Sequence, residues 1–156
     1  MASLFFYASA LVLWLLLAGC ARYKTIRPAH ILIALVTAAV SLVYDTLLGQ
    51  HAGLYHYISP QASIYYMVLG GAFVYPPVNV IYTLFLPQDK RSAIMYSILW
   101  IGVMLVFEYG SVLAGTIVFT GWNPFPWSPV TYIVTYLWIN LLYRYLRRHP
   151  LRRFAG

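Results

Sequence analysis

Charge is scarce in this sequence, and acidic charge is the scarcest. Among 156 residues there are only three Asp and Glu side chains, and 8% of the residues are charged whereas 62% are hydrophobic. In soluble domains roughly a quarter of the residues are charged. The shortage excludes a water-soluble globular domain and predicts an integral membrane protein whose main solvent is the lipid bilayer.

Cysteine is almost absent, since Cys20 is the single one. One cysteine excludes an intramolecular disulfide and every metal site built from several cysteines. Two histidines, His51 and His56, share one predicted loop, but their spacing of five does not match the helical i, i+4 pair of a zinc site. We therefore expect no metal site, and the sequence leaves the cofactor unknown.

The ten Lys and Arg residues fall into three clusters, at residues 22–27, 90–91 and 144–153. These clusters occupy alternate gaps between long apolar runs, and the gaps at residues 49–61 and 120–128 contain no Lys or Arg. Short loops rich in Lys and Arg remain in the cytoplasm, which predicts an N-terminus outside and a C-terminus inside. Because the bases flank apolar helices, we expect them to contact anionic lipid headgroups and not nucleic acid.

Five apolar runs are long enough to cross a bilayer, since a helix needs about 20 mostly apolar residues for this. The predicted spans lie near residues 2–21, 29–48, 62–86, 93–119 and 129–145. Gly70-Gly71 and Pro76-Pro77 predict a bend in the third. The predicted fold class is all-α: one transmembrane domain of five helices over residues 1–156, in a multi-pass protein of the cell membrane. Residues 146–156 would form a basic cytoplasmic tail.

One local motif suggests a different N-terminus. Leu17-Ala18-Gly19-Cys20 follows an apolar run and resembles a bacterial lipoprotein cleavage box. A signal peptide has a positively charged leader, whereas residues 1–6 contain no Lys or Arg. Cleavage would also place the basic cluster at residues 22–27 outside. We therefore expect the first helix to persist, with cleavage as the alternative.

Two acidic residues, Asp45 and Glu108, lie inside predicted spans, whereas Asp89 belongs to an inner loop. A rise of about 1.5 Å per residue from the inner boundary places both at similar depth in the outer half. An ionisable group inside a span costs about 2.5 to 3.5 kcal/mol on insertion scales, so it normally faces protein or a wet cavity. Small residues follow helical spacing beside each acid, which favours an inward-facing position for both.

We therefore expect an outer-half cavity that binds a small amphipathic molecule or lipid, for passage or sensing. The predicted lining residues are Asp45, Glu108, Tyr109, Tyr55, His56 and Trp122. A simpler interpretation is that the two acids only join helices through hydrogen bonds, or that Asp45 caps the outer end of its helix.

Two further functions stay open. One is an intramembrane enzyme that uses Asp45 and Glu108 on a lipid-linked substrate, although no nucleophile or metal is evident to complete the site. The other is an accessory subunit whose small-residue faces pack on a partner membrane protein, and a homo-oligomer is a related possibility.

The region of the third to fifth predicted spans contains Tyr75-Pro76, Asn79, Tyr82, Pro87, Tyr96, Glu108, Thr120 and Trp122. With these residues the chain resembles an uncharacterised family of small integral membrane proteins from Gram-positive bacteria. The family combines a Tyr-Pro element and a Pro-ended inner loop with a later intramembrane Glu and a Trp-bearing outer loop. Residues 122–127 are richer in proline than the family pattern. The resemblance implies a membrane-embedded fold and no particular activity.

Overall fold

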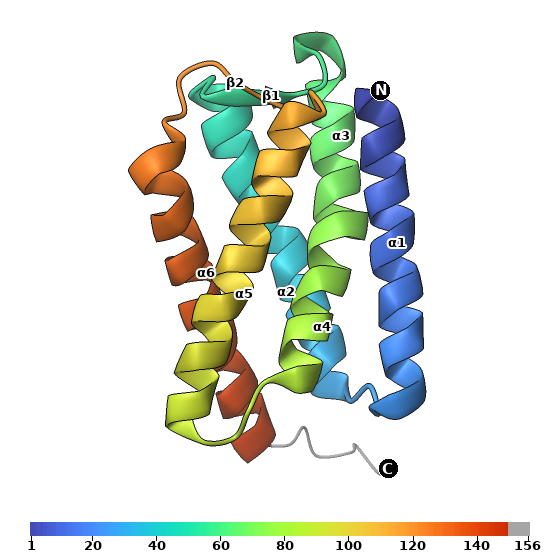
Figure 1. Ribbon diagram of the computed structural model, residues 1–156, viewed down its shortest axis with the longest axis vertical. Helices are drawn as coiled ribbons and strands as arrows, with labels where there is room; N and C mark the ends of the chain where they lie inside the picture. Colours follow the sequence, from blue (N-terminus) through green and yellow to red (C-terminus); the bar gives the residue numbers. More distant parts are fainter. Residues whose placement is uncertain (150–156) are drawn as a thin grey trace, which may run out of the picture.

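The computed structural model describes residues 1–149 and is built almost entirely of helices that run side by side (Figure 1). The all-helical fold class is thereby confirmed. The helices are α1 (Ala2–Tyr23), α2 (Pro28–Asp45), α3 (Ser63–Leu69), α4 (Tyr75–Phe85), α5 (Lys90–Leu113) and α6 (Pro124–Arg148). Shorter helical segments are η1 (Thr46–His51), η2 (Pro60–Ala62) and η3 (Gly70–Val74).

Four helical stretches are long and apolar enough to cross a membrane, within the part of the chain that the structure describes. They are Ala2–Tyr23, Pro28–His51, Pro60–Phe85 and Lys90–Leu113. Helix α6 has 25 residues but is not among them, and three arginines lie in its C-terminal part. These findings indicate a membrane protein, while the fifth span stays a prediction.

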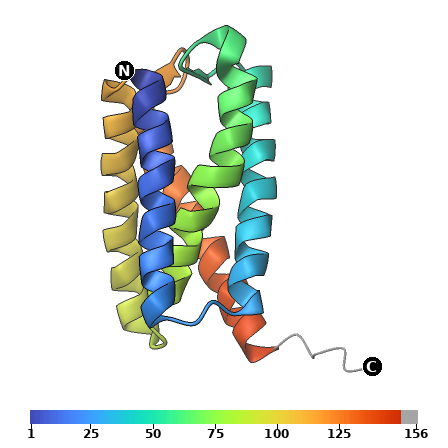
Figure 2. The same cartoon turned by 90° about the vertical axis from the view of Figure 1, so that its right-hand side faces the viewer.

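The third helical stretch changes direction along its length, as Figure 2 shows for the green segment. Here α3 and α4 are joined by the π-helical segment η3, which contains Gly70 and Gly71 and ends directly before Tyr75-Pro76-Pro77. Proline lacks the backbone donor that continues an α-helix, and a π-helical turn absorbs the irregularity. The interruption lies where the glycine and proline pairs predict it.

The C-terminal end of the predicted fourth span is wrong. Helix α5 ends at Leu113, and Gly115 then adopts φ +72°, a left-handed conformation that stops a helix and favours glycine. Strand β2 (Ile117–Phe119) follows and pairs antiparallel with β1 (Tyr55–Tyr57), with Tyr55 opposite Phe119. The β-branched residues after Gly115 suit a strand better than a helix.

The predicted bounds of the last helix are too short. Helix α6 begins at Pro124 instead of residue 129, but Phe125 departs from helical geometry (φ −110°, ψ 125°), so the regular helix begins after this kink. Proline is well suited to the first turn of a helix. Helix α6 continues to Arg148, so the first residues of the predicted cytoplasmic tail are helical. The rest of that tail, residues 150–156, lies outside the described residues.

The two ends of the bundle differ in composition. Strands β1 and β2 and the start of α1 lie at one end, which we name the strand end (Figure 1). The α1–α2 connection, the α4–α5 connection and the C-terminal turn of α6 lie at the other, the basic end. All three clusters of Lys and Arg fall at the basic end as far as the structure describes them.

Helix α1 belongs to the bundle. Phe6 and Leu17 are buried, Trp14 donates a hydrogen bond from Nε1 to the carbonyl of Phe73 at 3.0 Å, and Tyr66 donates to Ser3 Oγ at 3.2 Å. These contacts connect α1 to the α3–α4 stretch. That this helix escapes cleavage after Gly19 stays a prediction.

Candidate functional site

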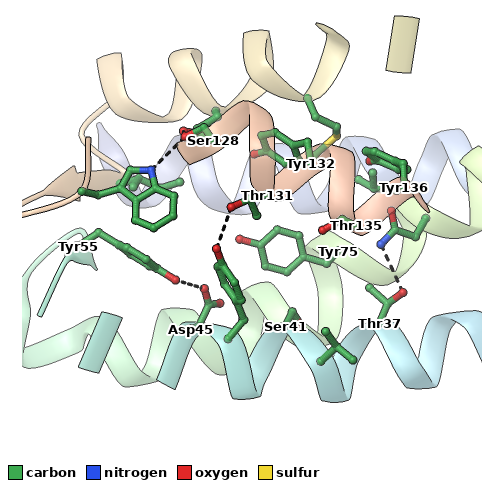
Figure 3. A pocket seen from close by; sticks show the side chains of 18 of the residues that line it. Thr37, Ser41, Asp45, Tyr55, Tyr75, Ser128, Thr131, Tyr132, Thr135 and Tyr136 are labelled. Atoms are coloured by element: carbon green, nitrogen blue, oxygen red, sulfur yellow. Dashed lines mark hydrogen bonds between the residues drawn. The ribbon is translucent and has the colours of Figure 1, made fainter. Parts of the chain in front are cut away.

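A cavity of about 160 Å³ lies between α2, α4, α5 and α6 in the half of the bundle nearer the strand end (Figure 3). An engineered apolar cavity of about 150 Å³ is large enough to bind benzene. The lining residues are Thr37, Val40, Ser41, Tyr44, Asp45, Tyr55, Tyr57, Tyr75, Val78, Asn79, Met104, Glu108, Ile117, Phe119, Trp122, Ser128, Thr131, Tyr132, Thr135, Tyr136 and Trp138. The space therefore suits a ring-sized group or a short chain.

Helix α2 supplies one wall of the cavity. It contributes Thr37, Val40, Ser41, Tyr44 and Asp45 to the lining. These positions recur every three to four residues, which places them on one face of the helix. Of the small residues spaced along this helix toward Asp45, Ser41 lines the cavity, whereas Ala34 and Ala38 do not. About 12 Å separates Thr37 and Asp45 along the helix axis, given a rise of about 1.5 Å per residue.

Helix α6 supplies the opposite wall through a second helical stripe of polar and aromatic residues. It consists of Ser128, Thr131, Tyr132, Thr135 and Tyr136. Tyr44 on α2 reaches across to Thr131, and their hydroxyl oxygens lie 2.8 Å apart. Figure 3 shows this bond between the two helices.

Asp45 is one of the two carboxyls in the cavity. Its side chain is 4% exposed, and Oδ1 accepts a hydrogen bond of 2.6 Å from the Tyr55 hydroxyl. Oδ2 is buried without a hydrogen-bond partner. Asp45 makes no helix-capping bond, because the chain continues in helical form through η1. The interpretation that Asp45 caps the outer helix end is therefore wrong.

Glu108 is the second carboxyl and is held by a different set of residues. Its Oε1 accepts a hydrogen bond of 2.5 Å from the Ser128 hydroxyl, and Ser128 Oγ accepts another of 3.0 Å from Trp122 Nε1. This series of bonds connects α5 to the first turn of α6 and to the loop before it. The two acids thus line one cavity while each is bonded to its own neighbours.

Four of the residues predicted for the cavity line it: Asp45, Glu108, Tyr55 and Trp122. The prediction for Tyr109 is wrong, because its side chain is 65% exposed on the outside of α5. Successive residues of a helix point about 100° apart, and the turn from Glu108 to Tyr109 leads away from the cavity.

The prediction for His56 is also wrong. His56 lies in β1 between Tyr55 and Tyr57, which both line the cavity. Side chains alternate between the two faces of a strand, so His56 points to the other face. Two lining residues that the sequence analysis missed, Tyr57 and Tyr132, follow the same rules of spacing: Tyr57 is two residues from Tyr55, and Tyr132 is four residues from Ser128.

The tyrosines of β1 are donors at the rim of the cavity. Burial raises the pKa of both Tyr55 and Tyr57 well above the usual value for tyrosine. Their hydroxyls therefore stay protonated at neutral pH. Tyr57 shares a hydrogen bond of 2.6 Å with Tyr75, and Tyr55 bonds Asp45, so strand and helices are joined around the same space.

The described residues contain no group of three or more His, Cys, Asp or Glu side chains placed to hold a metal ion. The chain matches no family model, no curated protein and no solved structure. The resemblance to a family of small membrane proteins therefore stays a prediction, and function has to be argued from the cavity itself.

Proposed function

We propose that this protein is a multi-pass protein of the cell membrane that binds a small amphipathic molecule in the cavity, for passage or sensing. The observation that carries the proposal is the unpartnered, buried Oδ2 of Asp45 in the wall of a cavity rich in aromatic side chains. Such an atom costs free energy unless it finds a partner, and a bound molecule would supply one.

The lining is amphipathic along its length. Val78, Met104 and Ile117 offer apolar surface, whereas tyrosine and threonine hydroxyls and the two carboxyls offer polar atoms. Ligand sites typically combine a mostly apolar and aromatic lining with a few polar groups that fix orientation. A small molecule with one polar end fits such a lining better than a purely apolar or a highly charged one.

The proposed orientation has the strand end outside, the basic end in the cytoplasm and five spans. It is supported by the gathering of Lys and Arg at one end of the described bundle and by the positive-inside rule. The cavity would then open in the outer half of the membrane.

A cavity-filling variant tests the binding proposal. Thr135 lines the cavity, whereas its neighbour Val134 is 56% exposed on the other side of α6. The Thr135→Phe variant should lose a small molecule that co-purifies with the wild-type protein in native lipid, and Val134→Phe should retain it. Mass spectrometry of the released molecules measures both. Equal retention by the two variants, or a wild-type protein that carries nothing, contradicts the proposal.

The contact between Ser128 and Glu108 supports the intramembrane enzyme as a second candidate. A serine hydroxyl that donates to a carboxylate at 2.5 Å has the geometry of a nucleophile beside a base. A fluorophosphonate probe, which forms a bond to an activated serine oxygen and releases fluoride, should then label the wild-type protein but not Ser128→Ala. Absence of labelling in the wild type rejects this candidate and leaves the binding proposal unaffected.

A further inference from the structure

The polar atoms left without a partner in the cavity wall are hydrogen-bond acceptors. They are Asp45 Oδ2 and Asn79 Oδ1, and both side chains are 4% exposed. The other buried side-chain atoms without a partner in the described residues, His56 Nδ1 and Trp100 Nε1, belong to residues outside the lining. A molecule that satisfies these two acceptors must donate hydrogen bonds.

Several donors of the cavity wall are already engaged. Tyr55 donates to Asp45, Ser128 donates to Glu108, and Asn79 Nδ2 donates to Thr37 Oγ1 at 3.3 Å. None of the described lining residues is a Lys, Arg or His. A carboxylate inside a membrane span normally has a positive or donating partner, and here the hydrogen bonds to the two acids come from neutral hydroxyls, those of Tyr55 and Ser128.

Aromatic rings stand at steep angles to one another beside Asp45. The rings of Tyr55 and Tyr57 meet at 77° with centroids 6.2 Å apart, and those of Tyr55 and Trp122 meet at 81° with centroids 6.3 Å apart. All three residues line the cavity. Rings set at steep angles around one space can turn several faces toward it, and ring faces attract ammonium groups through cation–π interaction.

From the end that contains Asp45, the cavity extends toward an end that carries less charge. Figure 3 places Asp45 and Tyr55 toward one end and Thr37 and Tyr136 toward the other. Val78 and Met104 add apolar surface to the wall. A molecule with a cationic head at Asp45 and an apolar body directed toward Tyr136 would match both ends.

Building on the proposed function, we infer that the bound molecule is an amphipathic organic ammonium of about the size of one ring with a short chain. Its ammonium group donates to Asp45 Oδ2 among the rings of Tyr55, Tyr57 and Trp122. Its positive charge compensates the carboxylates of Asp45 and Glu108, and its apolar part lies between α2 and α6.

Three probes of matched shape test the inference: phenethylammonium, the neutral phenethyl alcohol and the anionic phenylacetate. Binding to the full-length protein is measured by equilibrium dialysis in phosphatidylglycerol nanodiscs, with empty nanodiscs subtracted. Phenethylammonium should bind at least about tenfold more tightly than the alcohol, because only the cation gains cation–π and charge-assisted contacts. Phenylacetate should not bind saturably.

Asp45→Asn should reduce that preference to less than about threefold, since it removes the charge that the ammonium group contacts. Asp89→Asn is the matched control, because Asp89 is exposed and lies at the basic end, where it accepts a hydrogen bond from the Ser92 backbone. That variant should keep the wild-type preference. If Asp45→Asn does not fold, the comparison of the three probes on the wild-type protein still decides.

Equal binding of ammonium and alcohol, abolished by Thr135→Phe, would overturn the cationic ligand while the cavity remained a binding site. The cationic ligand is overturned in the same way if no probe binds but a neutral molecule co-purifies with the wild type. If no probe binds and nothing co-purifies, both the inference and the proposed function fail.

An ammonium group can belong to a free amine or to a lipid headgroup. Replacing part of the phosphatidylglycerol with phosphatidylethanolamine separates these sources. Competition with phenethylammonium identifies the lipid headgroup as the source, and unchanged binding identifies a free amine; either result retains the ammonium inference.

Discussion

The two halves of the bundle differ in what fills the space between the helices. Toward the basic end the space is closed by large buried side chains: Ile33, Tyr82 and Ile139 are completely buried, and Tyr143 and Leu146 join the same cluster. Toward the strand end the same helices leave a cavity lined by carboxyls and hydroxyls. The comparison suggests that one half mainly stabilises the fold and that the other is available for a ligand.

The two halves also differ in their hydrogen bonds. At the basic end, Arg144 bonds Asn140 Oδ1 at 2.6 Å and the Gln88 carbonyl at 3.0 Å, and His30 shares a bond of 2.9 Å with Tyr143. These contacts tie helix ends and connections together. In the cavity, by contrast, Asp45 Oδ2 and Asn79 Oδ1 have no partner. Of the four buried side-chain atoms without a partner in the described residues, two thus lie in the cavity wall, and Trp100 Nε1 lies beside the packed cluster.

The largest expected effect is a difference in thiol labelling between the strand end and the basic end. In a Cys20→Ala background, Asn123→Cys at the strand end should react with an impermeant thiol reagent in intact cells, whereas Ser92→Cys at the basic end should react only after lysis. Both positions are exposed, so burial does not account for a difference. Labelling of position 92 alone in intact cells would reverse the proposed orientation.

The half of the bundle toward the basic end, which is closely packed, should lose stability when side-chain volume is removed. Ile139→Ala removes a completely buried side chain and should lower the free energy of unfolding by about 2 to 5 kcal/mol. The matched control Leu137→Ala changes a side chain of the same helix that is 59% exposed, and it should have little effect. Unfolding in detergent monitored by circular dichroism measures both, and equal losses would contradict the assignment of a stabilising core.

The α2–η3 contact should resist added volume. A Cβ at Gly71 would lie 2.9 Å from Leu42 Cγ and 3.2 Å from Ser41 Oγ, so Gly71→Ala should destabilise the protein by about 1 to 3 kcal/mol. At Gly102 on α5 an added Cβ meets nothing within 4 Å, and Gly102→Ala should be neutral or stabilising. The same unfolding measurement compares them, and a neutral Gly71→Ala would mean that these helices can separate.

The smallest expected effect is the coupling of the two acids in the open half. Asp45→Asn and Glu108→Gln should change the free energy of unfolding non-additively, with an interaction of about 0.5 to 3 kcal/mol, because they share one cavity. Asp45→Asn combined with Asp89→Asn should be additive, since Asp89 lies at the other end. Additivity in both pairs would favour the simpler interpretation, in which each acid only joins its own helices.

Asp89, at the basic end, is held by a contact with a residue close to it in the sequence. Hydrogen bonds from Ser92, its backbone N–H first, hold the pKa of the exposed Asp89 carboxyl below its usual value. This is the N-cap of α5, a contact that can be anticipated from an aspartate placed before a helix.

The open half was only partly predictable. The depth of Asp45 and Glu108 followed from helical rise, and this was enough to expect them in one cavity. The prediction for Tyr109 was wrong because depth along a helix does not say which way a side chain faces. The prediction for His56 was wrong because the loop was not recognised as a strand. Side chains alternate along a strand, which directs Tyr55 and Tyr57 inward and His56 away.

The sequence by itself determined the helices, their approximate lengths and the separation of Lys and Arg to one end, because these depend on runs of neighbouring residues. The tertiary structure alone decided which stripe of α6 faces α2, that β1 pairs with β2, and that Asp45 Oδ2 lacks a partner. The physical reason lies in the surroundings of a membrane helix. Lipid is as apolar as a packed leucine side chain, so hydrophobicity does not separate the inward face from the outward face as it does in water. Contacts between segments far apart in the sequence, such as Tyr44 with Thr131, settle that choice.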